Sequence, residues 1–134
     1  MYTLTTVRLV SPDNSPSFGR VEVQFHGTWG TICENYWDLK DADVVCRQLG
    51  YDGALSALRD AAFGQGTGPI WLNRVHCGGY EKSVSHCTHA GWGGHNCRHY
   101  DDVSVVCRQI KGKFNDIHAL ILIILILSTP WWRY

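Results

Sequence analysis

The stretch Thr31–Cys46, TICENYWDLKDADVVC, passes from a loop into a segment of helical character. Asp38 is a residue type favoured at helix N-caps, and Asp41 follows three positions later as an acidic residue of the first turn. Gly50 is suited to end the helix. The apolar residues between them recur at helical spacing: Leu39, Ala42, Val45, Cys46 and Leu49. The pattern predicts a helix over residues 39–49 that directs Cys46 into the core.

The same stretch raises a question about function, because Cys33 directly precedes Glu34 and Asn35. A cysteine, a carboxylate and an amide in one loop allow three interpretations. The loop could be a metal site, a catalytic centre or the anchor of a disulfide.

Strands are predicted on both sides of this helix. Residues 7–10 form one, and residues 21–25 alternate apolar with polar side chains before a turn at Gly27 and a second hairpin strand. Further strands are expected in IWLNRVHC and VSVVC, and one helical turn in EKSVSHC, whereas ALSALRD is compatible with strand or helix. With 134 residues, the chain is expected to form one small, loop-rich α+β domain, residues 1–110, followed by a tail.

Charge gives no sign of nucleic acid binding. The chain has 12 Lys and Arg and 12 Asp and Glu, and residues 1–110 hold 9 basic against 11 acidic side chains. Because a basic patch is the usual electrostatic mark of such binding, nucleic acid is excluded as an expected partner.

The cysteines indicate an oxidising compartment. Their number is even and no CxxC pair occurs, which favours disulfides over a zinc ribbon or a redox motif; they are Cys33, Cys46, Cys77, Cys87, Cys97 and Cys107. Six cysteines allow 15 connectivities, which spacing alone does not resolve. The first residues, MYTLTTVRLV, lack the features of a secretion signal, so we interpret the chain as a fragment or an incomplete gene product.

The tail, residues 111–134, differs in composition. Ala119–Leu127 is an unbroken apolar run of nine residues, and residues 117–132 extend it to 16, whereas a membrane span needs about 20. A truncated membrane anchor, an extra strand and translated non-coding sequence all remain open. Membrane association through residues 117–132 is one expectation.

Four blocks taken together resemble a known family: GRVEVQFHGTWGTIC, WDLKDADVVCRQLGY, FGQGTGPIWLNRVHCGGYE and HNCRHYDDVSVVC. In order and spacing they are similar to a scavenger receptor cysteine-rich (SRCR) domain, over about Val7–Gln109. Phe18 (or a neighbour) and Tyr51 stand where the eight-cysteine form of that family would place its extra pair, so the chain resembles the six-cysteine group A. The resemblance implies a curved antiparallel β-sheet cradling one α-helix, and disulfides Cys33–Cys97, Cys46–Cys107 and Cys77–Cys87.

The resemblance also implies a divalent-cation site at Glu34, Asn35 and Asp101. All three residues depart from the family pattern but offer oxygen atoms, so weak binding of calcium is expected. The alternative is that these are solvated loop residues. A second family cation site would fall at Asn73, Arg74 and Glu81, where the positive charge of Arg74 favours an Arg74–Glu81 ion pair instead.

The segment RVEVQFHGTW resembles a stretch that binds bacterial surfaces and polyanions in relatives, which implies Arg20, Glu22 and Trp29 as ligand-binding residues. An ordinary amphipathic hairpin is the alternative. Zinc and Ser/His/Asp catalysis are not expected, because neither an HExxH motif nor a GxSxG elbow occurs.

These observations predict an extracellular, non-catalytic recognition module without an organic cofactor. Its ligands would be proteins, anionic glycans or microbial surfaces. The alternative is an accessory domain of a larger secreted enzyme, such as a protease or an amine oxidase.

Overall fold

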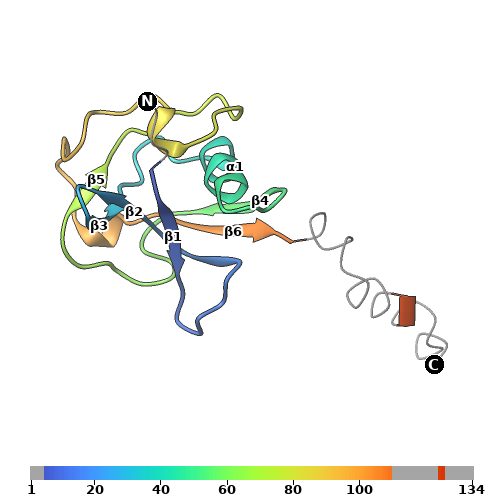
Figure 1. Ribbon diagram of the computed structural model, residues 1–134. Helices are drawn as coiled ribbons and strands as arrows, with labels where there is room; N and C mark the ends of the chain where they lie inside the picture. Colours follow the sequence, from blue (N-terminus) through green and yellow to red (C-terminus); the bar gives the residue numbers. More distant parts are fainter. Residues whose placement is uncertain (1–4, 110–123, 126–134) are drawn as a thin grey trace.

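The computed structural model describes residues 5–109 and 124–125 (Figure 1). Over these residues it contains six strands, one α-helix and two single-turn 3-10 helices. In chain order they are β1 (Val7–Val10), β2 (Phe18–Phe25), β3 (Thr28–Ile32), α1 (Leu39–Gln48), β4 (Gly53–Leu58), β5 (Ile70–Leu72), η1 (Val84–His86), η2 (His99–Asp101) and β6 (Ser104–Arg108).

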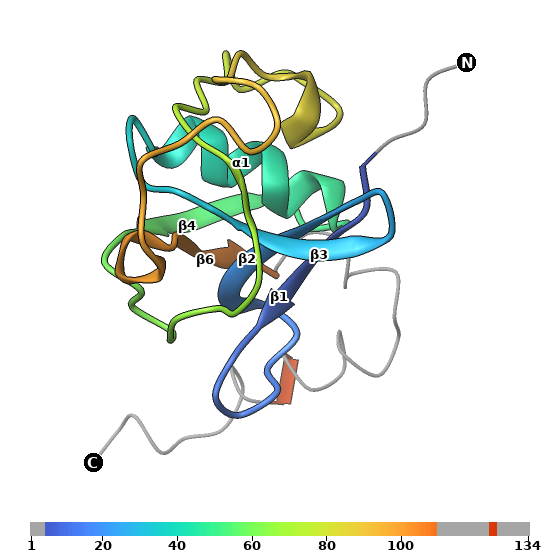
Figure 2. The ribbon, with the colours of Figure 1, turned by 90° about the vertical axis from the view of Figure 1, so that its left-hand side faces the viewer.

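Strand β2 organises the sheet because three strands pair with it. Strand β1 runs antiparallel along one edge of β2. On the other edge, β6 pairs with residues 18–20 and β3 with residues 22–25. The strand order is β4-β6-β2-β3-β5, so the sheet curls, and α1 lies against one side of it (Figure 2). The expected α+β fold, a curved sheet around one helix, is confirmed, except that β3 and β5 pair in parallel.

Helix α1 begins where the sequence predicts. The Asp38 side chain accepts the backbone N–H groups of Lys40 and Asp41, and the Asp41 carboxylate accepts the N–H of Asp38, which completes a capping box. Residues 42 and 44–46 are buried. Leu39 is different: its side chain is 48% exposed, so it does not belong to the buried face that the spacing predicted. Leu39 is the first residue of α1, and the buried part of the helix begins two positions later, at Asp41.

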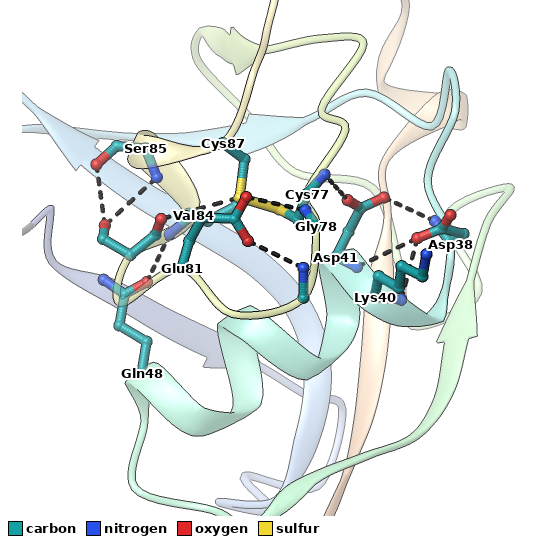
Figure 3. Close-up of a disulfide and its surroundings, with 12 residues drawn as sticks. Asp38, Lys40, Asp41, Gln48, Cys77, Gly78, Glu81, Val84, Ser85 and Cys87 are labelled. Atoms are coloured by element: carbon teal, nitrogen blue, oxygen red, sulfur yellow. Dashed lines mark hydrogen bonds between the residues drawn. A yellow bond between two sulfur atoms is a disulfide. The ribbon is translucent and has the colours of Figure 1, made fainter.

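Three disulfides connect the elements, and they are the pairs that the family resemblance implies. Cys46–Cys107 joins α1 to β6 through the core, and both residues are buried. Cys77–Cys87 closes a loop beside α1 (Figure 3). Cys33–Cys97 joins the end of β3 to the segment before η2. Trp37 is also fully buried.

The structure resolves one ambiguous segment of the sequence and shortens one predicted strand. The ambiguous stretch after Gly50 is a strand, β4, because it pairs with β6 and carries the sheet over α1. The predicted strand in IWLNRVHC is shortened to β5, residues 70–72. Beyond Leu72 the chain turns at Arg74, whose φ of 56° lies in the left-handed region and ends the pairing with β3.

The predicted domain boundary after residue 110 and nearly all of the tail fall outside the described residues. Ile124 and Leu125 are described and are exposed. Within the described ranges, no helix is both long and apolar enough to cross a membrane.

Candidate functional site

The loop after β3, residues 33–37, which we call the opening loop, is anchored by backbone pairing as well as by its disulfide. The Cys33 N–H donates to the carbonyl of Leu72 at 2.8 Å, and Cys33 forms an isolated β-bridge with Asp102. The Cys33–Cys97 disulfide therefore brings the residues after β3 next to those around η2. Of the three interpretations of this loop, the disulfide anchor is the one that the structure shows directly.

A polar hollow of about 440 Å³ lies beside this anchor, and it contains two of the three predicted cation ligands. It is lined by Asn35, Asn73, Arg74, Ala90, Gly94, His95, Asn96, Cys97 and Asp101. Asn35 Nδ2 donates to Asn73 Oδ1 at 3.0 Å. Asp101 Oδ2 accepts the backbone N–H of Arg98 at 3.1 Å, which closes the turn of η2.

Glu34, the third predicted ligand, is not among the lining residues of this hollow. Its Oε2 accepts the backbone N–H of Asp60 at 2.8 Å. In the described part of the chain, the candidate metal-binding group that includes Asp101 adds only Cys33 and Cys97. Those two sulfurs form a disulfide and are not available as thiolate ligands. The hollow thus offers Asp101 and Asn35, and Glu34 would have to leave Asp60 to join them.

At the second predicted cation position, the expected ion pair between Arg74 and Glu81 does not form, because each side chain has another partner. The Glu81 carboxylate accepts the N–H groups of Gly78 at 2.9 Å and Gly79 at 3.0 Å. Burial acts to raise the pKa of Glu81, but these backbone donors outweigh it and hold the pKa below its usual value. The guanidinium of Arg74 lies instead over the ring of Tyr36, 5.6 Å from its centre. The expected Arg74–Glu81 pair is therefore absent among the described ion pairs.

The predicted ligand-binding residues lie together on the sheet and include a partner that the sequence did not reveal. Glu22, which is only 5% exposed, accepts from Arg20 Nε at 2.9 Å and from Arg8 Nη2 at 2.6 Å. The Arg8 guanidinium also stacks on the ring of Trp29, 4.2 Å from its centre. We call Arg8, Arg20, Glu22 and Trp29 the charged ladder. Two guanidinium groups share one carboxylate, so it carries a net charge of about +1.

Arg8 was missed although a signal for it existed. The residue lies in the predicted strand over residues 7–10, and pairing with β2 places it directly opposite Glu22. Opposite charges across antiparallel strands are a favourable pair. Without the register, however, Glu22 had no assigned partner on β1.

Five histidines lie close to cysteines along the chain: His76, His86, His89, His95 and His99. In the described ranges they do not form a metal site, because neither group of three potential metal ligands contains a histidine. His99 instead fastens a loop: Nδ1 lies 2.9 Å from the buried Asp102 Oδ2, and Nε2 lies 2.9 Å from the Gly68 carbonyl. Asp102 also accepts the N–H of Gly66 at 2.7 Å. The hydroxyl oxygens of Ser83 and Ser85 lie 2.9 Å apart, and the Ser83 side chain caps η1 by accepting the backbone N–H of Ser85.

Comparison with known proteins identifies this arrangement. A family model described as "Scavenger receptor cysteine-rich domain" matches residues 12–108. The chain is 54% identical over 97 residues to a scavenger receptor cysteine-rich domain superfamily protein of Patiria pectinifera, covering 72% of this chain and 9% of that protein. It is 55% identical over 93 residues to galectin-3-binding protein of Bos taurus (69% and 17%), and 47% identical over 114 residues to lysyl oxidase homolog 4 of Homo sapiens (84% and 15%).

Solved structures agree with the sequence matches. The third SRCR domain of murine neurotrypsin superimposes with a TM-score of 0.72 at 45% identity, covering 80% of this chain and 99% of that one. The SRCR domain of mouse MARCO, in its dimeric form, gives 0.64 at 40% identity, covering 81% and 92%. The chain spans only 9–17% of the length of the curated relatives it matches. The chain belongs to the scavenger receptor cysteine-rich domain family.

Proposed function

We propose that this chain is an extracellular, non-catalytic recognition module that binds proteins, anionic glycans or microbial surfaces. The observation that carries the proposal is the charged ladder. Its side chains are held in place by ion pairs and by the stacking of Arg8 on Trp29, so little side-chain freedom is lost when a ligand binds. Arg8 remains 46% exposed and can offer donors to an anion.

Extracellular localisation is supported by the disulfides. All six cysteines are paired, which is typical of proteins folded in an oxidising compartment. The same pairing supports placement in the six-cysteine group A. The Tyr51 hydroxyl donates to the Pro16 carbonyl at 2.8 Å, so a hydrogen bond connects the two segments that the extra disulfide of the larger form would join.

The test is a binding screen on immobilised heparin and lipoteichoic acid by surface plasmon resonance, with calcium and with a chelator. Replacement of Arg8 by Gln should weaken binding by about fivefold, the effect of losing roughly 1 kcal/mol from an exposed charge contact, and added salt should weaken it further. Lys82→Gln is the matched control, because it removes an exposed cation outside the ladder. Binding to neither surface by the disulfide-intact domain, or equal losses in both variants, would refute this assignment of the ladder.

A second candidate is an accessory domain of a larger secreted enzyme. It is favoured by the match to lysyl oxidase homolog 4, of which this chain corresponds to 15%, and by the neurotrypsin domain. In that case the domain would position a catalytic unit and perform no chemistry itself. Sequencing the complete transcript separates the two candidates: a neighbouring catalytic domain supports the accessory role, and repeated copies of this domain support the receptor role.

A further inference from the structure

A second hollow, of about 470 Å³, lies beside the polar one and shares Arg74 and Ala90 with it. We call it the Arg74 pocket; its lining residues are Tyr36, Arg74, His76, Thr88, His89 and Ala90. They come from three segments: the opening loop, the turn after β5 and the chain after η1. Neither the charged ladder nor the predicted cation site at Glu34, Asn35 and Asp101 shares a residue with this pocket. Arg74 borders both hollows and belongs to the second predicted cation position, where no ion pair with Glu81 forms.

The floor of the Arg74 pocket is held rigidly. His76 and Thr88 form an antiparallel β-bridge in which the His76 N–H donates to the Thr88 carbonyl at 2.9 Å. The next residues along each segment, Cys77 and Cys87, are joined by a disulfide. A pocket on such a base exists before a ligand arrives, which reduces the ordering cost of binding.

The two residues at its wall have strained backbones. Tyr36 has a φ of 67° and Arg74 a φ of 56°, in the left-handed region that non-glycine residues rarely occupy. Such strain tends to collect where a side chain has to be presented for function. Here the strained turns place the guanidinium against a ring that is 59% exposed.

The charge of the pocket is unbalanced. Arg74 is exposed, and within the described residues no hydrogen bond or ion pair engages its guanidinium; its contact is the Tyr36 ring. No lining residue is acidic. Burial lowers the pKa of His89, whose Nδ1 accepts the N–H of Gly91 at 3.0 Å, and both favour the neutral imidazole. The Arg74 guanidinium therefore carries a positive charge that no acidic lining residue of the pocket balances, and it lies beside the Tyr36 ring.

We propose that the Arg74 pocket binds an acidic protein segment, in which an aromatic or branched apolar side chain enters the hollow and an adjacent carboxylate pairs with the Arg74 guanidinium. The planar guanidinium fork fits a carboxylate through two parallel hydrogen bonds. The hollow has the volume and the mixture of aromatic walls and few polar groups that are typical of ligand pockets. This inference deepens the proposed recognition of proteins and rests on it for its biological meaning.

Phenylacetate and phenylacetamide form a suitable pair of probes, since they share a ring and differ in charge. Chemical shifts of the 15N-labelled, disulfide-intact chain would be followed during titration in a chelator, so that no divalent cation contributes. Phenylacetate should bind with a dissociation constant in the millimolar range, as is expected for a probe of about ten non-hydrogen atoms that binds with ordinary rather than maximal affinity per atom. Its shifts should map to residues 36, 74–76 and 88–90, and phenylacetamide should bind about tenfold more weakly.

Three variants complete the test. Arg74→Asn removes the guanidinium while keeping a residue type that tolerates the left-handed backbone, and it should weaken phenylacetate binding by about tenfold. Arg74→Lys should retain part of the affinity, because it keeps the charge but loses the fork. Lys82→Gln should leave binding unchanged. Equal binding of both probes, shifts outside the pocket, no binding, or an Arg74→Asn variant that binds like the parent would each overturn the inference.

The proposed function fails separately, because it is scored on heparin and lipoteichoic acid. A loss of phenylacetate binding with those interactions intact would refute the Arg74 pocket alone. Retained phenylacetate binding with no binding to either surface would refute the ladder and leave the pocket.

Discussion

Ionisation of the Asp41 side chain should lower the free energy of unfolding of this domain as the pH rises from acidic to neutral. Its carboxylate is fully buried and accepts the N–H groups of Cys77 and Asp38, each at 2.8 Å (Figure 3). Burial raises the pKa of Asp41 from 3.8 to about 6, because removal from water disfavours the charged form more than the two N–H donors favour it.

The sign of the pH dependence follows from this rise. Between pH 3.8 and about 6 the folded chain holds the Asp41 proton more tightly than the unfolded chain does. Stability from this group is therefore fully present below pH 3.8 and is lost as the pH rises through about 6. At about 1.4 kcal/mol for each pH unit, the loss amounts to about 3 kcal/mol.

The perturbation is Asp41→Asn, measured by urea denaturation of the oxidised domain at pH 4 and pH 7. Asparagine has one acceptor oxygen, so one of the two backbone bonds is lost at a cost of about 1–3 kcal/mol. At pH 4 the folded parent carries a protonated Asp41, whose hydroxyl oxygen is a weaker acceptor, so the variant should be less stable than the parent by at most that amount. At pH 7 the deficit should shrink by about 2.4 kcal/mol, slightly less than the full effect because pH 4 is already above the unfolded pKa of 3.8. It should then be small or reversed.

Ser83→Ala is the matched control for this prediction. Ser83 is buried in the disulfide loop beside α1 and accepts a backbone bond from Ser85, but it does not titrate. Its cost should be the same at both pH values. If the difference between the parent and Asp41→Asn is also the same at pH 4 and pH 7, burial does not control the ionisation of Asp41 and the reasoning is refuted.

Three further predictions concern the ladder, the opening loop and the tail. Glu22→Gln should lower the free energy of unfolding by about 1–3 kcal/mol in urea denaturation, since it leaves Arg8 and Arg20 without a carboxylate partner. An unchanged denaturation midpoint would contradict the ladder's structural role. Calcium should raise the thermal unfolding temperature of Asn35→Asp more than that of the parent and have no effect on Asp101→Ala, whereas no shift in either of the first two would show that the loop is only a disulfide anchor. Deletion of residues 112–134 should leave a domain that folds under oxidising conditions, which circular dichroism and thiol titration would check, and failure to fold would place part of the tail in the domain.

Local chemistry made several features readable in advance. The N-cap at Asp38 with Asp41 three residues later predicted the start of α1, because capping depends on residues close in sequence. The alternation over residues 21–25 predicted a strand for the same reason, although Glu22, which the alternation placed on the exposed side, is buried. Where spacing left 15 connectivities open, the family resemblance supplied the pairing that the structure contains.

The candidate sites were predicted less completely. Glu34 was grouped with Asn35 and Asp101 because the family resemblance implies one cation site there, but the direction of each side chain depends on backbone donors from elsewhere, such as the N–H of Asp60. Arg8 escaped notice because its partner lies 14 residues away on another strand.

The sequence by itself determined the helix and the hairpin, since these depend on residue types at fixed local spacing. It also carried the resemblance to a known family, and that resemblance, not local spacing, implied the disulfide pairing. Only the tertiary structure decided which charges meet. The register of β1 on β2 brought Arg8 to Glu22, which already pairs with Arg20 of its own strand, and the turn after β5 directed Arg74 to Tyr36 instead of Glu81. Side-chain partners of this kind are set by the packing of distant segments, because an ion pair or a stacked ring depends on separations of a few ångströms that no local pattern specifies.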